Sequence, residues 1–187
     1  MDGITATSAR ILEIRQLIGT TTPRSTTVAA GSGDAFAAAL SAAVDGTTTS
    51  ASTARNAQGV PADLAAYGNG KVPRDALSEI GSTGHRLWAP AGQALEQLLA
   101  AAERDGVDIG ITDSYRSYDA QVDVARRKGL YSQGGLAAQP GTSPHGWGVA
   151  VDLDLDDAAQ KWMRANAGRF GFVEDTPREP WHWVYKT

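Results

Sequence analysis

Two histidines and an aspartate in the C-terminal part of the chain constrain its fold more than any other feature. His145 and Asp152 belong to the segment Ser-Pro-His-Gly-Trp-Gly-Val-Ala-Val-Asp at 143–152, and His182 ends the segment Glu-Pro-Trp-His at 179–182. A catalytic zinc ion takes three protein ligands, commonly imidazole nitrogens and carboxylate oxygens, and keeps a fourth position open. We therefore predict that the fold brings His145, Asp152 and His182 together around Zn2+.

The residues around these side chains predict two strands that present them on one side of a sheet. Side chains alternate between the two faces of a strand. In residues 149–155 this alternation places Asp152 opposite the valines that fill the core, and in residues 181–185 it places His182 opposite two tryptophans. We expect the face that carries Asp152 and the face that carries His182 to coincide.

Glu179 is the predicted general base. It lies three residues before His182, and the proline that follows it favours an extended backbone. A carboxylate near a metal ion that it does not bind can take a proton from the water that the metal activates. The alternative is that Glu179 forms an ion pair with Arg178 within a loop.

Three segments of the chain resemble the signature of the LAS, or M15, metallopeptidases. The first has the pattern Ser-x-His-x-x-Gly-x-Ala-x-Asp, and the second is Glu-x-x-His. The third, Asp-Ser-Tyr-Arg-Ser-Tyr-Asp-Ala-Gln at 113–121, is similar to the Gly-Tyr-Arg-Ser segment of this family, with Asp-Ser replacing the usual small pair. The family includes VanY-type D-alanyl-D-alanine carboxypeptidases, D-Ala-D-Ala dipeptidases and phage L-alanyl-D-glutamate endopeptidases.

The resemblance implies roles for further residues. It gives Arg116 the task of stabilising negative charge on the scissile carbonyl oxygen, as a fixed cation beside that atom does. It places Gln121 near the substrate, as in the phage endopeptidases. Ser143, which occupies one of the specified positions of the first motif, and Ser114 can hydrogen-bond the substrate or groups around the zinc ion. Tyr115 belongs to a group of aromatic residues that either line a peptide cleft or pack in the core.

The order of predicted elements favours an α+β fold. Helices and short strands are mixed without regular βαβ alternation, which predicts an antiparallel sheet flanked by helices. The resemblance implies the same Hedgehog/DD-peptidase-like fold. We expect strands at 107–112, 149–155, 170–173 and 181–185, and helices at 90–104, 118–128 and 158–166.

Residues 1–59 are predicted to form an extension that precedes a metallopeptidase domain at 60–187. Thr, Ser, Ala and Gly dominate residues 20–59, a composition typical of linkers. Two short apolar stripes at 8–18 and 34–44 predict small helices. We expect these helices either to pack on the domain or to bind a partner protein.

Composition excludes several classes of function. The net charge of -4 argues against non-specific binding of nucleic acid, and the lack of cysteine excludes a disulfide framework or a cysteine-based zinc site. No apolar run is long enough to span a membrane. The N-terminus lacks the features of a signal peptide. A cell-wall substrate nevertheless favours an extracytoplasmic, wall-associated or secreted protein.

These observations predict a zinc-dependent peptidase of peptidoglycan stem peptides, most similar to the VanY-type D,D-carboxypeptidases. Arg126 and Arg127 are the side chains considered for holding the terminal carboxylate. One alternative is an endopeptidase that cuts a crosslink or the L-Ala-D-Glu bond. Another is a non-catalytic wall-binding module, because the Hedgehog domains share the fold without being enzymes. The presence of Glu179 argues against the module, since a binding domain has no need of the base.

Overall fold

The computed structural model of the chain describes residues 52–187. The helices predicted at 8–18 and 34–44 lie outside the described residues. Arg55 donates hydrogen bonds to the carbonyl oxygens of Tyr185 at 2.9 Å and Thr187 at 3.2 Å. Residues just ahead of the predicted boundary at 59/60 therefore pack against the end of the last strand. Within the described part, the structure contains no helix that is long and apolar enough to cross a membrane.

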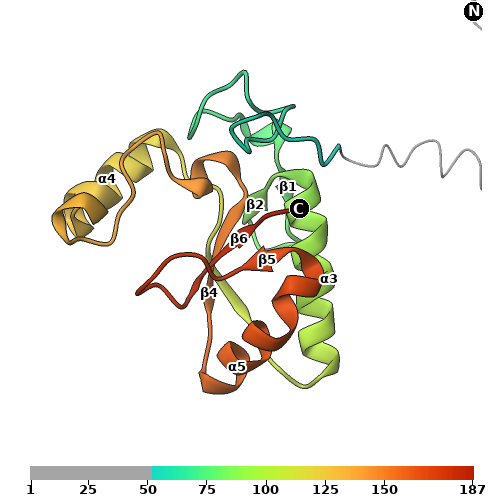
Figure 1. Cartoon of the computed structure of the whole chain (residues 1–187). Helices are drawn as coiled ribbons and strands as arrows, with labels where there is room; N and C mark the ends of the chain where they lie inside the picture. The colour runs from blue at the N-terminus through green and yellow to red at the C-terminus, as the bar shows by residue number, and fades with distance from the viewer. Residues whose placement is uncertain (1–51) are drawn as a thin grey trace, which may run out of the picture. The chain divides into compact units, whose positions relative to one another are not determined.

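The centre of the described unit is a four-stranded antiparallel sheet with the strand order β3-β4-β6-β5 (Figure 1). Its strands are β3 Gly110–Asp113, β4 Ala150–Asp154, β5 Phe172–Val173 and β6 His182–Tyr185. A separate two-stranded sheet pairs β1 Ser78–Glu79 with β2 Arg86–Leu87. The antiparallel pairing confirms the predicted fold class. Each predicted strand is present but shorter, and β3 also extends one residue beyond its predicted end.

Within residues 52–187 the helices are α3 Ala89–Arg104, α4 Tyr118–Lys128 and α5 Asp157–Asn166. Four short 3-10 turns connect the elements of this part of the chain: η1 Arg74–Ala76, η2 Tyr131–Gln133, η3 Pro144–Trp147 and η4 Ala167–Phe170. The Ser117 hydroxyl accepts a hydrogen bond from the backbone of Ala120 and so caps the start of α4. Gly129, with φ of 70°, ends that helix as predicted. In Figure 1, α3 and α5 lie together on one side of the sheet, whereas α4 projects on the other side.

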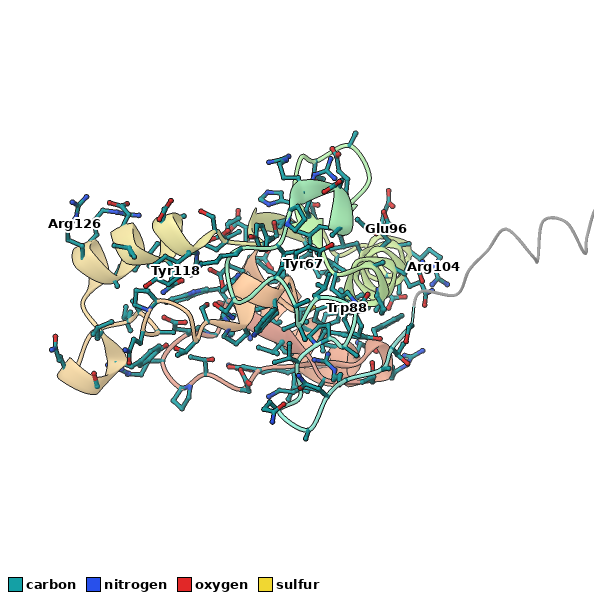
Figure 2. The ribbon with its side chains drawn as sticks, turned by 90° about the horizontal axis from the view of Figure 1, so that it is seen from above. Tyr67, Trp88, Glu96, Arg104, Tyr118 and Arg126 are labelled. Carbon is teal, nitrogen blue, oxygen red and sulfur yellow. The ribbon has the colours of Figure 1, made fainter. Side chains whose placement is uncertain are left out.

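The core lies between α3 and the sheet. Leu95 and Leu98 of α3 and Val151 of β4 are fully buried there. Burying each leucine contributes roughly 2 kcal/mol, so this layer holds the sheet in place. Figure 2 shows Trp88 within this interior, whereas Arg104 and Arg126 project outward at opposite ends of the molecule. The helix predicted at 90–104 is confirmed as α3.

Candidate metal centre

The register of the two central strands brings Asp152 and His182 side by side. Asp152 of β4 pairs directly with His182 of β6. Residues that lie directly opposite each other in an antiparallel pair point to the same face of the sheet. The prediction that the two side chains share a face is confirmed. The alternation of apolar and polar residues along each strand was therefore sufficient to place them.

His145 reaches the same place from the turn η3, which a second turn holds in position. The backbone N–H of Gly70 donates to the carbonyl oxygen of Gly146 at 2.8 Å, and the Asn69 side chain donates to the carbonyl oxygen of Ser143 at 2.8 Å. A Cβ atom on Gly146 would lie 2.1 Å from the side-chain oxygen of Asn69. Only glycine allows the turn at 69–70 to approach His145 this closely.

The three side chains form one cluster of ligand atoms. One ligand atom from each of His145, Asp152 and His182 lies within 4.8 Å of the others. Nδ1 of His145 lies 2.7 Å from the carbonyl oxygen of Ser114. Because a carbonyl only accepts hydrogen bonds, Nδ1 carries the proton and Nε2 is left as an acceptor. Nδ1 of His182 lies 3.1 Å from the hydroxyl of Thr176, which leaves its Nε2 as the ligand atom.

Two atoms of this cluster show that a cation fits between them. Nε2 of His145 and Oδ1 of Asp152 are 3.3 Å apart, both are buried, and neither has a hydrogen-bond partner among residues 52–187. Two buried acceptors without a donor are unfavourable, and a metal ion that binds both removes the penalty. Two imidazoles and a carboxylate are the donor set of a catalytic zinc site.

The electrostatic surroundings keep two of the three ligands, Asp152 and His182, deprotonated. Burial lowers the pKa of His182 to about 4, and repulsion from His145 acts in the same direction. Burial alone would raise the pKa of Asp152, but His145, His182 and Arg116 more than offset this effect and hold the pKa below its usual value. At neutral pH both side chains are therefore in the form that binds a metal.

Glu179 lies beside the cluster with its side chain almost completely buried. Its backbone carbonyl accepts a hydrogen bond from the N–H of His182 at 3.0 Å. Burial raises the pKa of Glu179. The Tyr131 hydroxyl opposes this rise, the negative charge of Asp152 adds to it, and the positive charge of Lys128 again opposes it. A carboxyl group with a raised pKa accepts a proton more readily than an ordinary glutamate does, which suits a general base.

The alternative of an ion pair between Glu179 and Arg178 is not what the structure shows. The Arg178 guanidinium instead donates to the carbonyl oxygen of Gly135 at 3.0 Å and, more weakly, to that of Gly134 at 3.4 Å. Arg178 therefore ties the loop that carries Glu179 to the loop after α4. Burial raises the pKa of Tyr131, and the nearby Glu179 carboxylate raises it further. The Tyr131 hydroxyl and this carboxylate nevertheless lie outside hydrogen-bonding geometry.

Arg116 is held beside the cluster by three side chains. Its guanidinium donates two hydrogen bonds to Oδ2 of Asp113, at 2.9 and 2.5 Å, one to Gln121 at 2.8 Å and one to Asp152 at 3.4 Å. Four of its five N–H donors are thus engaged. Asp113, one of the two residues that differ from the segment of the resembled family, accepts two of these hydrogen bonds from Arg116.

The predicted substrate-binding residues lie either at the cavity beside the cluster or in contact with other parts of the protein. Ser143 is buried and lines the cavity at the cluster. Gln121 instead accepts from Arg116 and donates to the carbonyl oxygen of Ala138 at 2.9 Å, so its amide is engaged behind the site. The Ser114 hydroxyl lies 3.1 Å from Nδ1 of His85, and only its carbonyl reaches the cluster. Tyr115 is half-buried against the core. Substrate contact by these residues stays a prediction.

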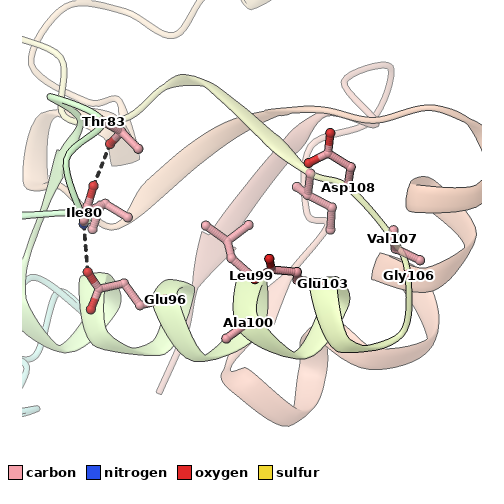
Figure 3. Close-up of a pocket in the computed structure, with 11 residues that line it drawn as sticks. Ile80, Thr83, Glu96, Leu99, Ala100, Glu103, Gly106, Val107 and Asp108 are labelled. Atoms are coloured by element: carbon pink, nitrogen blue, oxygen red, sulfur yellow. Dashed lines mark hydrogen bonds between the residues drawn. The ribbon is translucent and has the colours of Figure 1, made fainter.

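The cluster lines a small cavity of about 80 Å³, here called the metal cavity. Its walls come from η3, the end of α4, the loop after α4 and the loop before β6. A larger hollow of about 590 Å³, here called the α3 groove, runs along α3 between residues 80–83, which follow β1, and residues 106–109 (Figure 3). Carboxylates and apolar side chains line that groove, and Glu96 accepts a hydrogen bond from the N–H of Gly81.

Among the residues of the metal cavity that were not predicted from the sequence, three carry polar side chains. Tyr131, Lys128 and Thr176 line it together with the predicted ligands. Thr176 lies six residues before His182 and Tyr131 lies in a loop after α4, and neither belongs to a recognisable motif. Lys128 could have been found because it adjoins Arg126 and Arg127, the pair considered for the terminal carboxylate. Neither arginine lines the metal cavity.

Comparisons with known proteins agree with this geometry. A sequence profile of the VanY family, described as D-alanyl-D-alanine carboxypeptidase, matches residues 84–187. A D-alanyl-D-alanine carboxypeptidase of Enterococcus faecalis is 30% identical over an alignment that covers 56% of this chain and 50% of its own length. The chain thus spans half the length of that relative.

Two solved structures have a similar fold. One is a variant of the D,D-pentapeptidase VanY from a VanB-type resistance cassette in complex with Zn(II); it is 28% identical, with a TM-score of 0.51, over 59% of this chain and 78% of its own. The other is VanYB in complex with D-alanine-D-alanine, 29% identical with a TM-score of 0.51, over 59% of this chain and 77% of its own. These similarities confirm the predicted peptidase fold.

Proposed function

The chain belongs to the VanY family of D-alanyl-D-alanine carboxypeptidases, and we propose that it is a zinc-dependent carboxypeptidase that removes the terminal D-alanine from peptidoglycan stem peptides. The observation that carries the proposal is the pair of buried acceptors on His145 and Asp152, which face each other without a partner beside the base Glu179. The VanYB structure with D-alanine-D-alanine supports the choice of substrate.

His145, Asp152 and His182 would hold the zinc ion. When bound, zinc acts as a Lewis acid that polarises the scissile carbonyl and makes a neighbouring water molecule more acidic. Neighbouring groups orient the two histidine ligands, since the Ser114 carbonyl fixes the ring of His145 and Thr176 contacts the ring of His182. Such support of ligands by neighbouring groups is what tunes a metal site.

Glu179 moves the proton in this mechanism. Its carboxylate accepts a proton from the attacking water and then donates that proton to the nitrogen of the leaving D-alanine. Burial excludes bulk water from this carboxylate and raises its pKa, so the proton is held long enough to be passed on. A buried base beside the ligands also argues against the non-catalytic wall-binding module.

Arg116 stabilises the negative charge that develops on the carbonyl oxygen. The hydrogen bonds to Asp113 and Gln121 hold its guanidinium rigidly, so little reorganisation accompanies the reaction. The one N–H donor that is not engaged with protein is available to the substrate. Ser143, at the wall of the metal cavity, is the side chain best placed among the predicted residues to contact the peptide.

The substrate indicates where the protein acts. Stem peptides of mature peptidoglycan lie outside the membrane, so we propose that the protein acts there, in the wall or as a secreted enzyme.

We also propose that the predicted extension at residues 1–59 binds a partner protein. Deleting residues 1–51, which leaves Arg55 and its hydrogen bonds to the end of the last strand in place, should change where the protein accumulates without changing kcat/KM on a soluble peptide. Unchanged localisation would refute the proposal.

The proposed activity is tested by mass spectrometry of a muropeptide digest. The purified protein should remove one terminal alanine from pentapeptides, a chelator should block the reaction, and added zinc should restore it. Opened crosslinks or a cut L-Ala-D-Glu bond would instead identify an endopeptidase. Bound zinc without any cleavage would favour the binding module.

A further inference from the structure

We propose that Lys128 binds the free C-terminal carboxylate of the peptide substrate and thereby makes the site selective for chain ends. The proposal rests on the proposed function, because it names the group that distinguishes a carboxypeptidase from an endopeptidase. An endopeptidase has no terminal carboxylate to hold and gains nothing from a cation at this position.

The chemistry of the reaction decides on which side of the site the carboxylate must lie. Glu179 delivers its proton to the nitrogen of the leaving residue, so that residue lies on the Glu179 side of the metal cavity. In a terminal D-alanine the carboxylate is bonded to the carbon next to that nitrogen. The cation that binds it must therefore lie near Glu179 without neutralising it by a direct ion pair.

Lys128 meets this condition. It lines the metal cavity, and its charge opposes the rise in pKa that burial causes at Glu179, so the two groups are near each other. Lys128 forms no ion pair within the described part of the chain. Its side chain is exposed at the rim of the cavity, where an ammonium group stays hydrated until a carboxylate arrives.

The other cations of this region are already engaged. Arg116 also lines the metal cavity, but Asp113, Gln121 and Asp152 take four of its five donors. Arg126 and Arg127 both bind Asp123, at 2.6 and 2.7 Å. Arg127 lines a neighbouring hollow instead of the metal cavity. Among the cations that line the metal cavity in residues 52–187, Lys128 alone is uncommitted.

The backbone places Lys128 firmly. It is the last residue of α4, where the partial negative charge of the helix end favours a cation. Its carbonyl oxygen accepts a hydrogen bond from the N–H of Leu136 at 3.2 Å, which joins the end of the helix to the loop that lines the cavity. The flexible side chain is thus anchored at its base, and only the ammonium group has to adjust to the substrate.

The test compares two substrates and four proteins. The substrates are a stem pentapeptide that ends in D-Ala-D-Ala and the same peptide with a C-terminal carboxamide. The proteins are the full zinc-loaded chain and its variants Lys128→Met, Lys128→Arg and Arg126→Met. Arg126→Met is the matched control, because it removes a cation from the same helix end but outside the cavity.

The wild-type chain should cleave the free acid better than the amide. Lys128→Met should lose about tenfold to a hundredfold in kcat/KM on the acid, mainly through KM, and little on the amide, because a charge-assisted hydrogen bond to the carboxylate is removed. Lys128→Arg should keep most of the preference, and Arg126→Met should keep all of it.

Two other outcomes would overturn the proposal and can be told apart. If the wild-type chain cleaves the acid and Lys128→Met keeps the same acid-over-amide preference, Lys128 is not the carboxylate-binding residue, and the proposed carboxypeptidase function stands. If the zinc-loaded wild-type chain cleaves neither peptide, the proposed function fails and the role of Lys128 fails with it.

Discussion

The metal cavity and the α3 groove are both hollows of the same folded unit, yet they differ in size and in the state of their polar atoms. The groove is larger, about 590 Å³ against about 80 Å³. Among residues 52–187, buried side-chain atoms without a partner include three that line the metal cavity, on Tyr131, His145 and Asp152, and none that line the groove. Unsatisfied buried atoms, and not volume, indicate where a ligand is needed.

The largest expected effect is the loss of the metal itself. His182→Ala removes one of three ligands, so zinc affinity should fall by well over a hundredfold and peptidase activity should disappear. Metal content of the dialysed variant, measured by inductively coupled plasma mass spectrometry, gives the result. Retention of one zinc per chain would mean that another residue is the third ligand.

The next effect separates metal binding from proton transfer. Glu179→Gln keeps the shape of the side chain but cannot accept a proton, so kcat should drop by about a hundredfold to ten-thousandfold while zinc content and melting temperature hold. Steady-state kinetics on a pentapeptide, with metal analysis of the same sample, provide the measurement. Normal turnover in this variant would refute the assignment of the base.

The free energy of unfolding of the metal-free protein should depend on pH because His182 is buried. Its pKa is about 4 in the folded chain against 6.5 in the unfolded chain, so between these values the unfolded state binds more protons. The stability that neutral His182 contributes is fully present above pH 6.5 and is lost as the pH falls through 4. It amounts to about 3 kcal/mol.

Urea unfolding of the metal-free protein at pH 7 and pH 4 measures this loss. The lowered pKa of Asp152 adds a change of the same sign at lower pH. His182→Gln should remove the part of the loss that lies between pH 6.5 and 4, and an unchanged profile in that variant would show that His182 is not the group responsible.

The smallest expected effect on activity comes from a substitution in the α3 groove. Glu103→Gln changes a carboxylate that lines the α3 groove and forms no ion pair within residues 52–187. Zinc content should be unchanged, kcat/KM should stay within about twofold, and the free energy of unfolding should move by less than about 0.5 kcal/mol. A loss of activity comparable to that of Glu179→Gln would show that the groove takes part in the function.

Local sequence patterns were enough to predict the framework of the site. Strand alternation placed Asp152 and His182 on one face, and the register of β4 and β6 bears this out. The turn that carries His145 has Gly148 at φ of 64° and Gly146 against Asn69, a sharp bend and a close approach that glycine allows. These features depend on neighbours in the sequence or on a single strand pairing.

Features that depend on two loops meeting in space could not be predicted. The position of Lys128 and Tyr131 beside Glu179 requires the loop after α4 to fold against the loop before β6, which Arg178 joins through its bond to Gly135. No periodicity encodes such a contact. The hydrogen bonds of the Gln121 amide to Arg116 and to the carbonyl oxygen of Ala138 were likewise not predictable, and its contact with the substrate stays a prediction.

The most direct test of the account is to locate zinc in crystals of the zinc-loaded protein by anomalous diffraction at the zinc absorption edge. We predict one strong peak in the metal cavity, bound by Nε2 of His145, a carboxylate oxygen of Asp152 and His182. A peak among the carboxylates of the α3 groove, or none in the metal cavity, would contradict the account.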